Sequence, residues 1–210
     1  MKNQRLKGLY LISNHQHAED QHLLDDVDLA LQSGAKILQY RDKSLDQEKR
    51  LLQCQRLRTM TASYDCLLII NDDARLAQLV EADGVHLGQQ DGNISDARQL
   101  LGNDKIIGIS CYNDIELARQ AADEGADYIA FGRFFPSRTK PNAVQASVDL
   151  LHQARNLQLP IVAIGGISKD NAPGLINAGA DMIAVIDAVF GQRDIKTATQ
   201  QFQNLFTSQG

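Results

Sequence analysis

The stretch "AGADMIAVI", residues 178–186, joins the end of a helical pattern to a short apolar run. Gly179 can end a helix in the left-handed conformation, and the apolar residues that follow are typical of a strand covered on both faces. Related junctions occur at "SGAKI" (33–37), "EADGV" (81–85) and "EGADYI" (124–129). A recurring junction of this kind predicts a chain built from repeated helix–strand units.

Eight short apolar runs recur along the chain, about 26 residues apart, which is the length of one strand plus one helix. They lie at 8–13, 35–40, 66–71, 83–88, 105–110, 126–132, 160–166 and 180–186. Helical apolar stripes are expected between them, at 45–64, at 143–157 (Val144, Val148, Leu151 and Ala154) and at 195–206. Strands that alternate with helices predict βαβ units and a parallel sheet.

Eight such units are the number in a (β/α)8 TIM barrel, and 210 residues fit the lower end of its size range. A doubly wound open sheet is the alternative, but the even spacing and the lack of a glycine-rich dinucleotide fingerprint disfavour it. We therefore expect a single-domain α/β barrel over residues 1–210. Its active site should lie at the C-terminal ends of the strands.

The composition indicates a soluble globular protein, with 43% apolar and 22% charged residues. A net charge of −5 argues weakly against nucleic-acid binding, and no run of 18 apolar residues predicts a membrane span. The N-terminal residues lack the apolar core of a signal peptide. Three irregularly spaced cysteines do not suggest disulfides, so a cytoplasmic location is expected.

Long polar side chains follow the second apolar run, in "KILQYRDKS" (36–44). Gln39, Arg41 and Lys43 stand at every second position, so strand alternation would direct all three to the mouth of the barrel. An anion with several oxygens suits the fork of an arginine and the point charge of a lysine.

Acidic side chains follow the third and fourth runs. Asn71, Asp72 and Asp73 end the third run, and Asp91 lies in the loop after the fourth. One of the two adjacent aspartates is expected to cap the next helix. Acids beside bases suggest Mg²⁺, which prefers one or two carboxylates together with substrate phosphates.

The remaining strand ends add neutral donors and glycines. Ser110 is a candidate hydrogen-bond donor, whereas Cys111 is expected to pack in the core and His86 to be a hydrogen-bonded core histidine. The loop "FPSRTK" (135–140) combines hydroxyl and basic groups, and Gly165–Gly166 would let backbone N–H groups approach an anion. Together these features predict two anionic small-molecule ligands, one of them a diphosphate bound through Mg²⁺.

Six motifs, in order along nearly the whole chain, resemble the thiamine-phosphate synthase family. They are "QYRDK" (39–43), "NDDARLA" (71–77), "DGVHLGQQD" (83–91), "GIS" (108–110), "FPSRTK" (135–140) and "VAIGGI" (162–167). The resemblance implies a transferase that joins hydroxymethylpyrimidine diphosphate to a thiazole phosphate and releases pyrophosphate. It implies a dissociative reaction in which pyrophosphate departs first and the thiazole nitrogen captures the resulting cation.

The resemblance also implies roles for individual residues. Asp72 and Asp91 would hold Mg²⁺, which leaves Asp73 as the helix cap. Arg41, Lys43, Ser110 and Lys140 would be the catalytic groups around the leaving pyrophosphate. The pyrimidine diphosphate would contact Gln39, Arg41, Lys43, Asn71, Ser110 and Lys140. The thiazole phosphate would contact Ser137, Arg138, Thr139, Gly166, Ile186 and Asp187.

Two positions depart from the family pattern. Ser137 stands where threonine is commoner, and Asp187 stands where serine is expected. Either backbone N–H groups bind the phosphate while Asp187 points away, or its carboxylate weakens the binding of thiazole phosphate. The nearest rival function is a thiazole tautomerase, which needs no metal–diphosphate site, and a second rival is a non-catalytic sensor of phosphate ligands. The sequence carries no indication of the oligomeric state.

Overall fold

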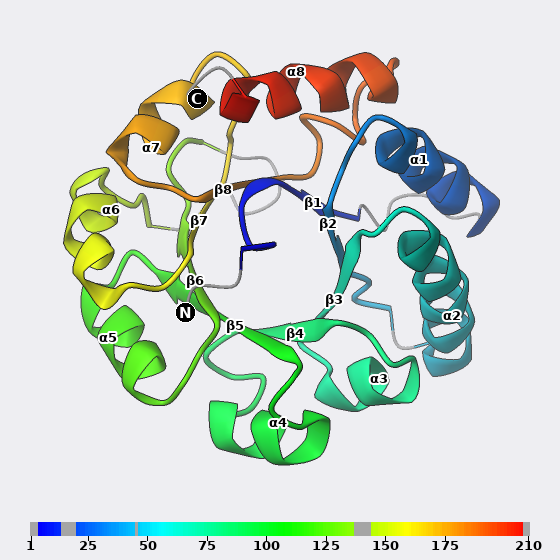
Figure 1. The fold of residues 1–210 in the computed structure, drawn as a ribbon, viewed down its shortest axis with the longest axis horizontal. Coiled ribbons are helices and arrows are strands. Elements are labelled where there is room, and N and C mark those ends of the chain that lie inside the picture. Colours follow the sequence, from blue (N-terminus) through cyan, green and yellow to red (C-terminus); the bar gives the residue numbers. More distant parts are fainter. Residues whose placement is uncertain (1–3, 14–19, 45, 137–143, 208–210) are drawn as a thin grey trace.

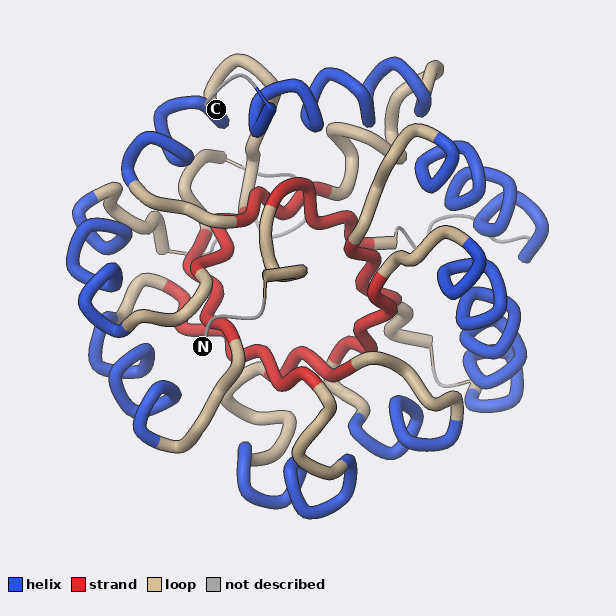
Figure 2. Tube along the Cα trace, viewed as in Figure 1, coloured by secondary structure: helices blue, strands red, loops and turns tan. Residues whose placement is uncertain are grey.

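The computed structural model describes residues 4–13, 20–44, 46–136 and 144–207. Eight parallel strands form a closed barrel in chain order, because β1 pairs with β8 as well as with β2. Helices surround this barrel (Figure 1), and the strands form a continuous inner ring in the Cα trace (Figure 2). The expected TIM barrel is confirmed, and the open-sheet alternative is wrong.

The elements alternate strictly along the chain. The strands are β1 (Gly8–Ile12), β2 (Ile37–Tyr40), β3 (Leu67–Asn71), β4 (Gly84–Leu87), β5 (Ile106–Tyr112), β6 (Tyr128–Gly132), β7 (Ile161–Ile164) and β8 (Met182–Val185). The helices are α1 (Asp20–Gln32), α2 (Gln47–Ser63), α3 (Ala74–Leu79), α4 (Ile94–Leu101), α5 (Ile115–Asp123), α6 (Asp149–Ala154), α7 (Ala172–Ala178) and α8 (Ile195–Thr207), with a 3₁₀ turn, η1 (Arg155–Leu157), after α6. Within the described ranges, no helix is long and apolar enough to cross a bilayer.

Strand alternation divides the apolar residues into two cores. One lies between the sheet and the helices and includes Leu38, Leu68 and Ile129. The other fills the barrel interior with side chains such as Tyr10, Ile69 and Met182. Leu6, just before β1, belongs to the inner core, and the segment that carries it crosses the centre of the ring in Figure 1. The interior is thus packed, and the open space lies at the opposite end, beyond the C-terminal ends of the strands.

The recurring junctions have a physical role at the other end of the barrel. Gly34, Gly125 and Gly179 all adopt positive φ, between 88° and 113°, as expected for glycines that end helices. At two of the junctions, the aspartate directly before a strand accepts a hydrogen bond from the strand before it and forms an ion pair with an arginine. Asp83 accepts from Leu68 N–H at 2.8 Å and pairs with Arg58, while Asp127 accepts from Ile107 N–H at 2.8 Å and pairs with Arg98.

The third aspartate of this set, Asp181, accepts from Ile161 N–H at 2.8 Å. Each of the three carboxylates therefore satisfies an N–H at the first residues of a strand, where the ladder has only just begun. The repeat seen in the sequence is a repeated hydrogen bond as well as a repeated turn.

One helical expectation is wrong at its beginning. The stripe at 143–157 becomes α6 and η1, which begin only at Asp149, and Val144 and Val148 are 67% and 41% exposed. Ala146 N–H instead donates to Arg133 O at 2.7 Å, and the Gln145 side chain donates to Phe134 O at 2.8 Å. The segment before α6 is therefore bound to the loop after β6, and its backbone is not available for a helix.

Asp127→Ala should destabilise the fold by about 1–3 kcal/mol, because it leaves the buried Ile107 N–H without an acceptor. Urea denaturation measures the loss. Asp123→Ala, at the exposed end of α5, is the matched control and should change stability by less than about 0.5 kcal/mol. Equal effects of the two substitutions would show that the junction carboxylate contributes no specific hydrogen bond.

Candidate active site

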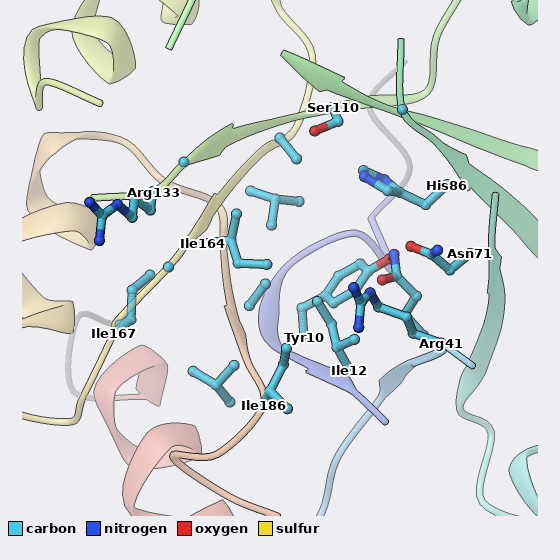
Figure 3. A pocket seen from close by; sticks show the side chains of 18 of the residues that line it. Tyr10, Ile12, Arg41, Asn71, His86, Ser110, Arg133, Ile164, Ile167 and Ile186 are labelled. Atoms are coloured by element: carbon cyan, nitrogen blue, oxygen red, sulfur yellow. The ribbon is translucent and has the colours of Figure 1, made fainter. Parts of the chain in front are cut away.

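A cavity of about 500 Å³ lies at the C-terminal ends of the strands. Figure 3 shows Arg41, Asn71 and His86 on one side of it, and Ile164, Ile167 and Ile186 on the other. The cavity therefore has a polar half, built from β2 to β5, and a largely apolar half, built from β7 and β8. Of the residues expected at the site, it is lined by Gln39, Arg41, Lys43, Asn71, Asp72, Asp91, Ser110, Gly166, Ile186 and Asp187.

The basic residues of the polar half, Arg41 and Lys43, follow the end of β2. β2 ends at Tyr40, so Arg41 and Lys43 lie beyond the strand, yet both still line the cavity. Arg41 N–H donates to the buried Ser13 Oγ at 2.8 Å, which continues the contact between β1 and β2 past the strand end. Ser13 was not singled out in the sequence, where it looks like an ordinary loop residue.

The acidic residues occupy a sharp turn after β3. Asp72 has φ of 64°, a conformation uncommon outside glycine, and its N–H donates to His86 O at 2.8 Å. Asp73 caps α3 by accepting from Leu76 N–H at 2.9 Å, which confirms its expected role. Because Asp73 is used by the helix, Asp72 is the carboxylate turned to the cavity.

Asp91 reaches Asp72 from the loop after β4. Gly88 N–H donates to Asp91 Oδ2 at 3.0 Å, and a Cβ at Gly88 would come within 2.6 Å of the same oxygen. Burial, then the negative charge of Asp91 and a hydrogen bond to its carboxyl group, raise the pKa of Asp72, and nearby Lys43 partly opposes the rise. Two carboxylates thus share a small space, which disfavours the ionisation of Asp72.

This pair has the donor chemistry of a Mg²⁺ site. Carboxylate oxygens are the ligands that Mg²⁺ prefers, and a cation between them would relieve the repulsion that raises the pKa of Asp72. Across the part of the chain that the structure describes, no cluster of three or more candidate ligands occurs. Asp72 and Asp91 would therefore complete a coordination shell only with water or with oxygens of a bound ligand.

Glycines open the other half of the cavity to an anion. Gly165 and Gly166 have φ of 104° and 63°, and a Cβ at Gly166 would lie 2.3 Å from Pro136 O. Among the described residues, the N–H groups of Gly166 and Ile167 have no hydrogen-bond partner. Ile186 and Asp187 follow β8 and line the same part of the cavity, with Asp187 exposed.

Two tyrosines on the cavity floor, Tyr10 and Tyr128, were missed in the sequence. Tyr10 and Tyr128 join their hydroxyl groups at 2.8 Å, Gln39 donates to Tyr10 Oη at 3.0 Å, and His86 Nδ1 lies 3.0 Å from Tyr128 Oη. His86 is hydrogen-bonded, as expected, but it also lines the cavity. Tyrosines inside apolar runs give no sequence signal of this kind, since they look like any other core aromatic residue.

The other candidates divide into two groups. Ser110 lines the cavity from β5, and Cys111 is fully buried, with burial raising the pKa of its thiol to about 12, which fits a packing role. Ser137, Arg138, Thr139 and Lys140 lie outside the described residues, so their expected roles stay predictions.

Comparison with known proteins identifies the family of this chain. A family model described as thiamine monophosphate synthase matches residues 9–189. The chain belongs to the thiamine-phosphate synthase family. It is 50% identical to the thiamine-phosphate synthase of Alcanivorax borkumensis over 96% of this chain and 95% of that protein. It is also 50% identical to the one of Nitrosococcus oceani over 97% and 94% of the two chains.

A solved relative has the same architecture. The thiamine phosphate pyrophosphorylase of Pyrococcus furiosus superposes with a TM-score of 0.87, at 34% identity and 98% coverage of both chains. This chain and that relative therefore share the barrel fold as well as the family.

Asp72→Asn should stabilise the protein at neutral pH in metal-free buffer. Because the pKa of Asp72 is raised in the fold, the stability that this group contributes is present below its ordinary value of 3.8 and is lost as the pH rises through the folded value. Solvent screens a half-buried carboxylate, so we expect a gain of about 2–4 °C in Tm, the effect of ~1 kcal/mol in a chain of this size. Asparagine also tolerates positive φ better than most residues.

The neighbouring Asp73→Asn is the matched control for this measurement. Asparagine keeps the cap of α3 but loses the ion pair with Arg50, at 3.0 Å, so its Tm should be unchanged or lower. A lower Tm for Asp72→Asn without metal at pH 7 would contradict repulsion between the two carboxylates.

Proposed function

We propose that this chain catalyses the formation of thiamine monophosphate from hydroxymethylpyrimidine diphosphate and a thiazole phosphate, with release of pyrophosphate. The observation that carries the proposal is the division of one cavity into a half with acidic and basic side chains and a half with glycines at positive φ. Asp72 and Asp91 face each other beside Arg41 and Lys43 in one half. In the other half lie the N–H groups of Gly166 and Ile167, which have no hydrogen-bond partner within the described ranges. The full-length identity to synthases supports the same reaction.

The reaction needs no nucleophile or strong base from the protein, because the two substrates supply the bonds that break and form. The C–O bond to the diphosphate breaks with its electron pair on oxygen, and the lone pair of the thiazole nitrogen then forms the new C–N bond. The protein must neutralise the charge that grows on the departing pyrophosphate, and each oriented group of that kind contributes roughly 3–4 kcal/mol. Holding the second substrate in place can contribute on the order of 7–11 kcal/mol.

Each group has a part in this scheme. Asp72 and Asp91 would hold Mg²⁺, which neutralises diphosphate charge when bound. Arg41, Lys43 and Lys140 would contact the leaving pyrophosphate, with Asn71 and Ser110 as neutral hydrogen-bonding groups. Gln39 would contact the pyrimidine. Gly166, Ile186 and Asp187 would lie at the thiazole phosphate, together with Ser137, Arg138 and Thr139.

The rival functions have less support. A tautomerase needs no paired carboxylates beside cationic groups, and the relatives compared above are synthases. A non-catalytic sensor would bind ligand without turnover. A cytoplasmic enzyme without nucleic-acid or membrane partners fits two small anionic substrates.

Purified protein supplied with Mg²⁺ and both substrates should release pyrophosphate and form thiamine phosphate in equal amounts. Asp91→Ala should lower kcat on the order of 10²–10³-fold, because it removes a group that stabilises charge in the transition state. Asp104→Ala, at an exposed position outside the cavity, is the control and should leave kcat unchanged. Binding without product would support the sensor, and isomerisation of the thiazole alone would support the tautomerase.

Asp187→Ser should lower the KM for the thiazole phosphate about fivefold, because it removes a like charge worth ~1 kcal/mol at close range in water. The KM for the pyrimidine diphosphate, measured in the same assay, should not change. If neither value changes, the Asp187 carboxylate does not face the phosphate, and backbone N–H groups carry the binding.

A further inference from the structure

A row of four polar side chains crosses the barrel interior beneath the polar half of the cavity. Gln39 Nε2 lies 3.0 Å from Tyr10 Oη, Tyr10 Oη lies 2.8 Å from Tyr128 Oη, and Tyr128 Oη lies 3.0 Å from His86 Nδ1. These residues come from β2, β1, β6 and β4, so the row joins opposite sides of the barrel. All four line the cavity (Tyr10 and His86 are labelled in Figure 3).

The row is built into the fold. Gln39, Tyr10 and Tyr128 are each no more than 3% exposed, and the Tyr128 ring stacks on His86 with 5.6 Å between centroids. The Tyr128 ring also requires a glycine on the neighbouring strand, because a Cβ at Gly108 would lie 1.9 Å from Tyr128 Cζ. Gly108 is the first residue of the "GIS" motif, and the Tyr128 ring explains on steric grounds why that position is a glycine.

The protons in this row can be counted. Burial raises the pKa of both Tyr10 and Tyr128 far above the physiological range, so each hydroxyl keeps its single proton. If Gln39 donates to Tyr10 Oη, the Tyr10 proton must go to Tyr128, the other hydrogen-bond partner of that hydroxyl among the described residues. The Tyr128 proton then goes to His86 Nδ1, which must be an acceptor, so a neutral His86 carries its proton on Nε2.

The opposite direction is also self-consistent, and it has the opposite consequence for the ligand. If His86 Nδ1–H donates, each hydroxyl turns round and Tyr10 donates to the amide oxygen of Gln39. The amide of Gln39 must then be flipped, with its NH₂ group toward the cavity. The tautomer of His86 and the orientation of the Gln39 amide are therefore linked through two tyrosines.

We propose that Tyr10 and Tyr128 are positioning residues that hold the Gln39 amide with its carbonyl oxygen toward the cavity, so that the site selects a ring bearing an amino group over the same ring bearing an oxo group. In this orientation Gln39 Oε1 has no hydrogen-bond partner among the described residues, and a ligand N–H can donate to it. An oxo group would place acceptor against acceptor and be rejected. The identity of the ring as a pyrimidine rests on the function proposed above.

The His86 tautomer tests the direction of the row without any substrate. In protein labelled with ¹⁵N-histidine at pH 8, the signal of His86, one of five histidines, is identified by its loss in His86→Asn. We expect protonated Nε2 and unprotonated Nδ1. A proton on Nδ1 would overturn the proposal, whatever reaction the enzyme catalyses.

Discrimination between substrates tests the consequence. The ratio of kcat/KM for the aminopyrimidine diphosphate to that for its oxo analogue should fall about tenfold or more in Tyr10→Phe, because a released amide can present either group to the ring. Tyr128→Phe should lower the ratio similarly, although it leaves the Gln39–Tyr10 contact intact. Thermal melting checks that both variants, which keep the aromatic ring, remain folded.

Tyr40→Phe is the matched control. Tyr40 is equally buried, but it lies in the outer core and its hydroxyl donates to Gln53 Oε1 at 2.6 Å. Its ratio should stay at the wild-type value. Equal losses on both substrates in Tyr10→Phe, or full discrimination in Tyr128→Phe, would overturn the proposal. Wild-type protein without turnover would instead refute the proposed function and leave the tautomer result standing.

Discussion

Pairing of β1 with β8 is the contact on which the rest of the structure depends. It aligns Gly8 with Met182 and Tyr10 with Ala184, and it closes the sheet so that no strand edge is left unpaired. Closure also separates an inner core from an outer one and brings the C-terminal end of every strand to a single rim. Residues as distant in sequence as Arg41, Asp91 and Gly166 line one cavity for this reason, although no local feature of the chain connects them.

The pair of carboxylates at this rim, Asp72 and Asp91, destabilises the fold locally. Asp72 is partly buried against Asp91 and adopts positive φ, and both features raise the free energy of the folded chain. Neighbouring groups limit the cost: Gly88 leaves space for the Asp91 carboxylate and donates a hydrogen bond to it, and Lys43 partly opposes the rise in the pKa of Asp72. Repulsion that a bound cation would relieve adds to the binding free energy of that cation. Carboxylates already neutralised by protein groups would bind it more weakly.

The sequence predicted the barrel well because repetition is a local signal. All eight strands fall within or beside the expected runs, and Gly34, Gly125 and Gly179 have the positive φ expected of glycines that end helices. The polar strand ends were also predictable, since alternation directs Gln39 and Arg41 to one face. The start of α6 was not, because Val144 and Val148 have helical spacing but the backbone near them is bound to the loop after β6. Tertiary hydrogen bonds of this kind leave no trace in periodicity. Ser13 was missed for the same reason, since it binds Arg41, which is far from it in sequence.

Tyr10 and Tyr128 show most clearly why the interior of the barrel cannot be read from pattern alone. Each occupies a position where the inner core requires a large apolar side chain, and each ring satisfies that requirement. Their hydroxyl groups impose a second condition, because a buried polar atom is costly unless it is paired. Two tyrosines alone would leave a donor or an acceptor unmatched. Gln39 and His86 supply the missing partners, and both also line the cavity. The polar atoms of the core therefore link the tautomer of His86 to the orientation of the Gln39 amide at the binding site, through the same four residues that pack the interior.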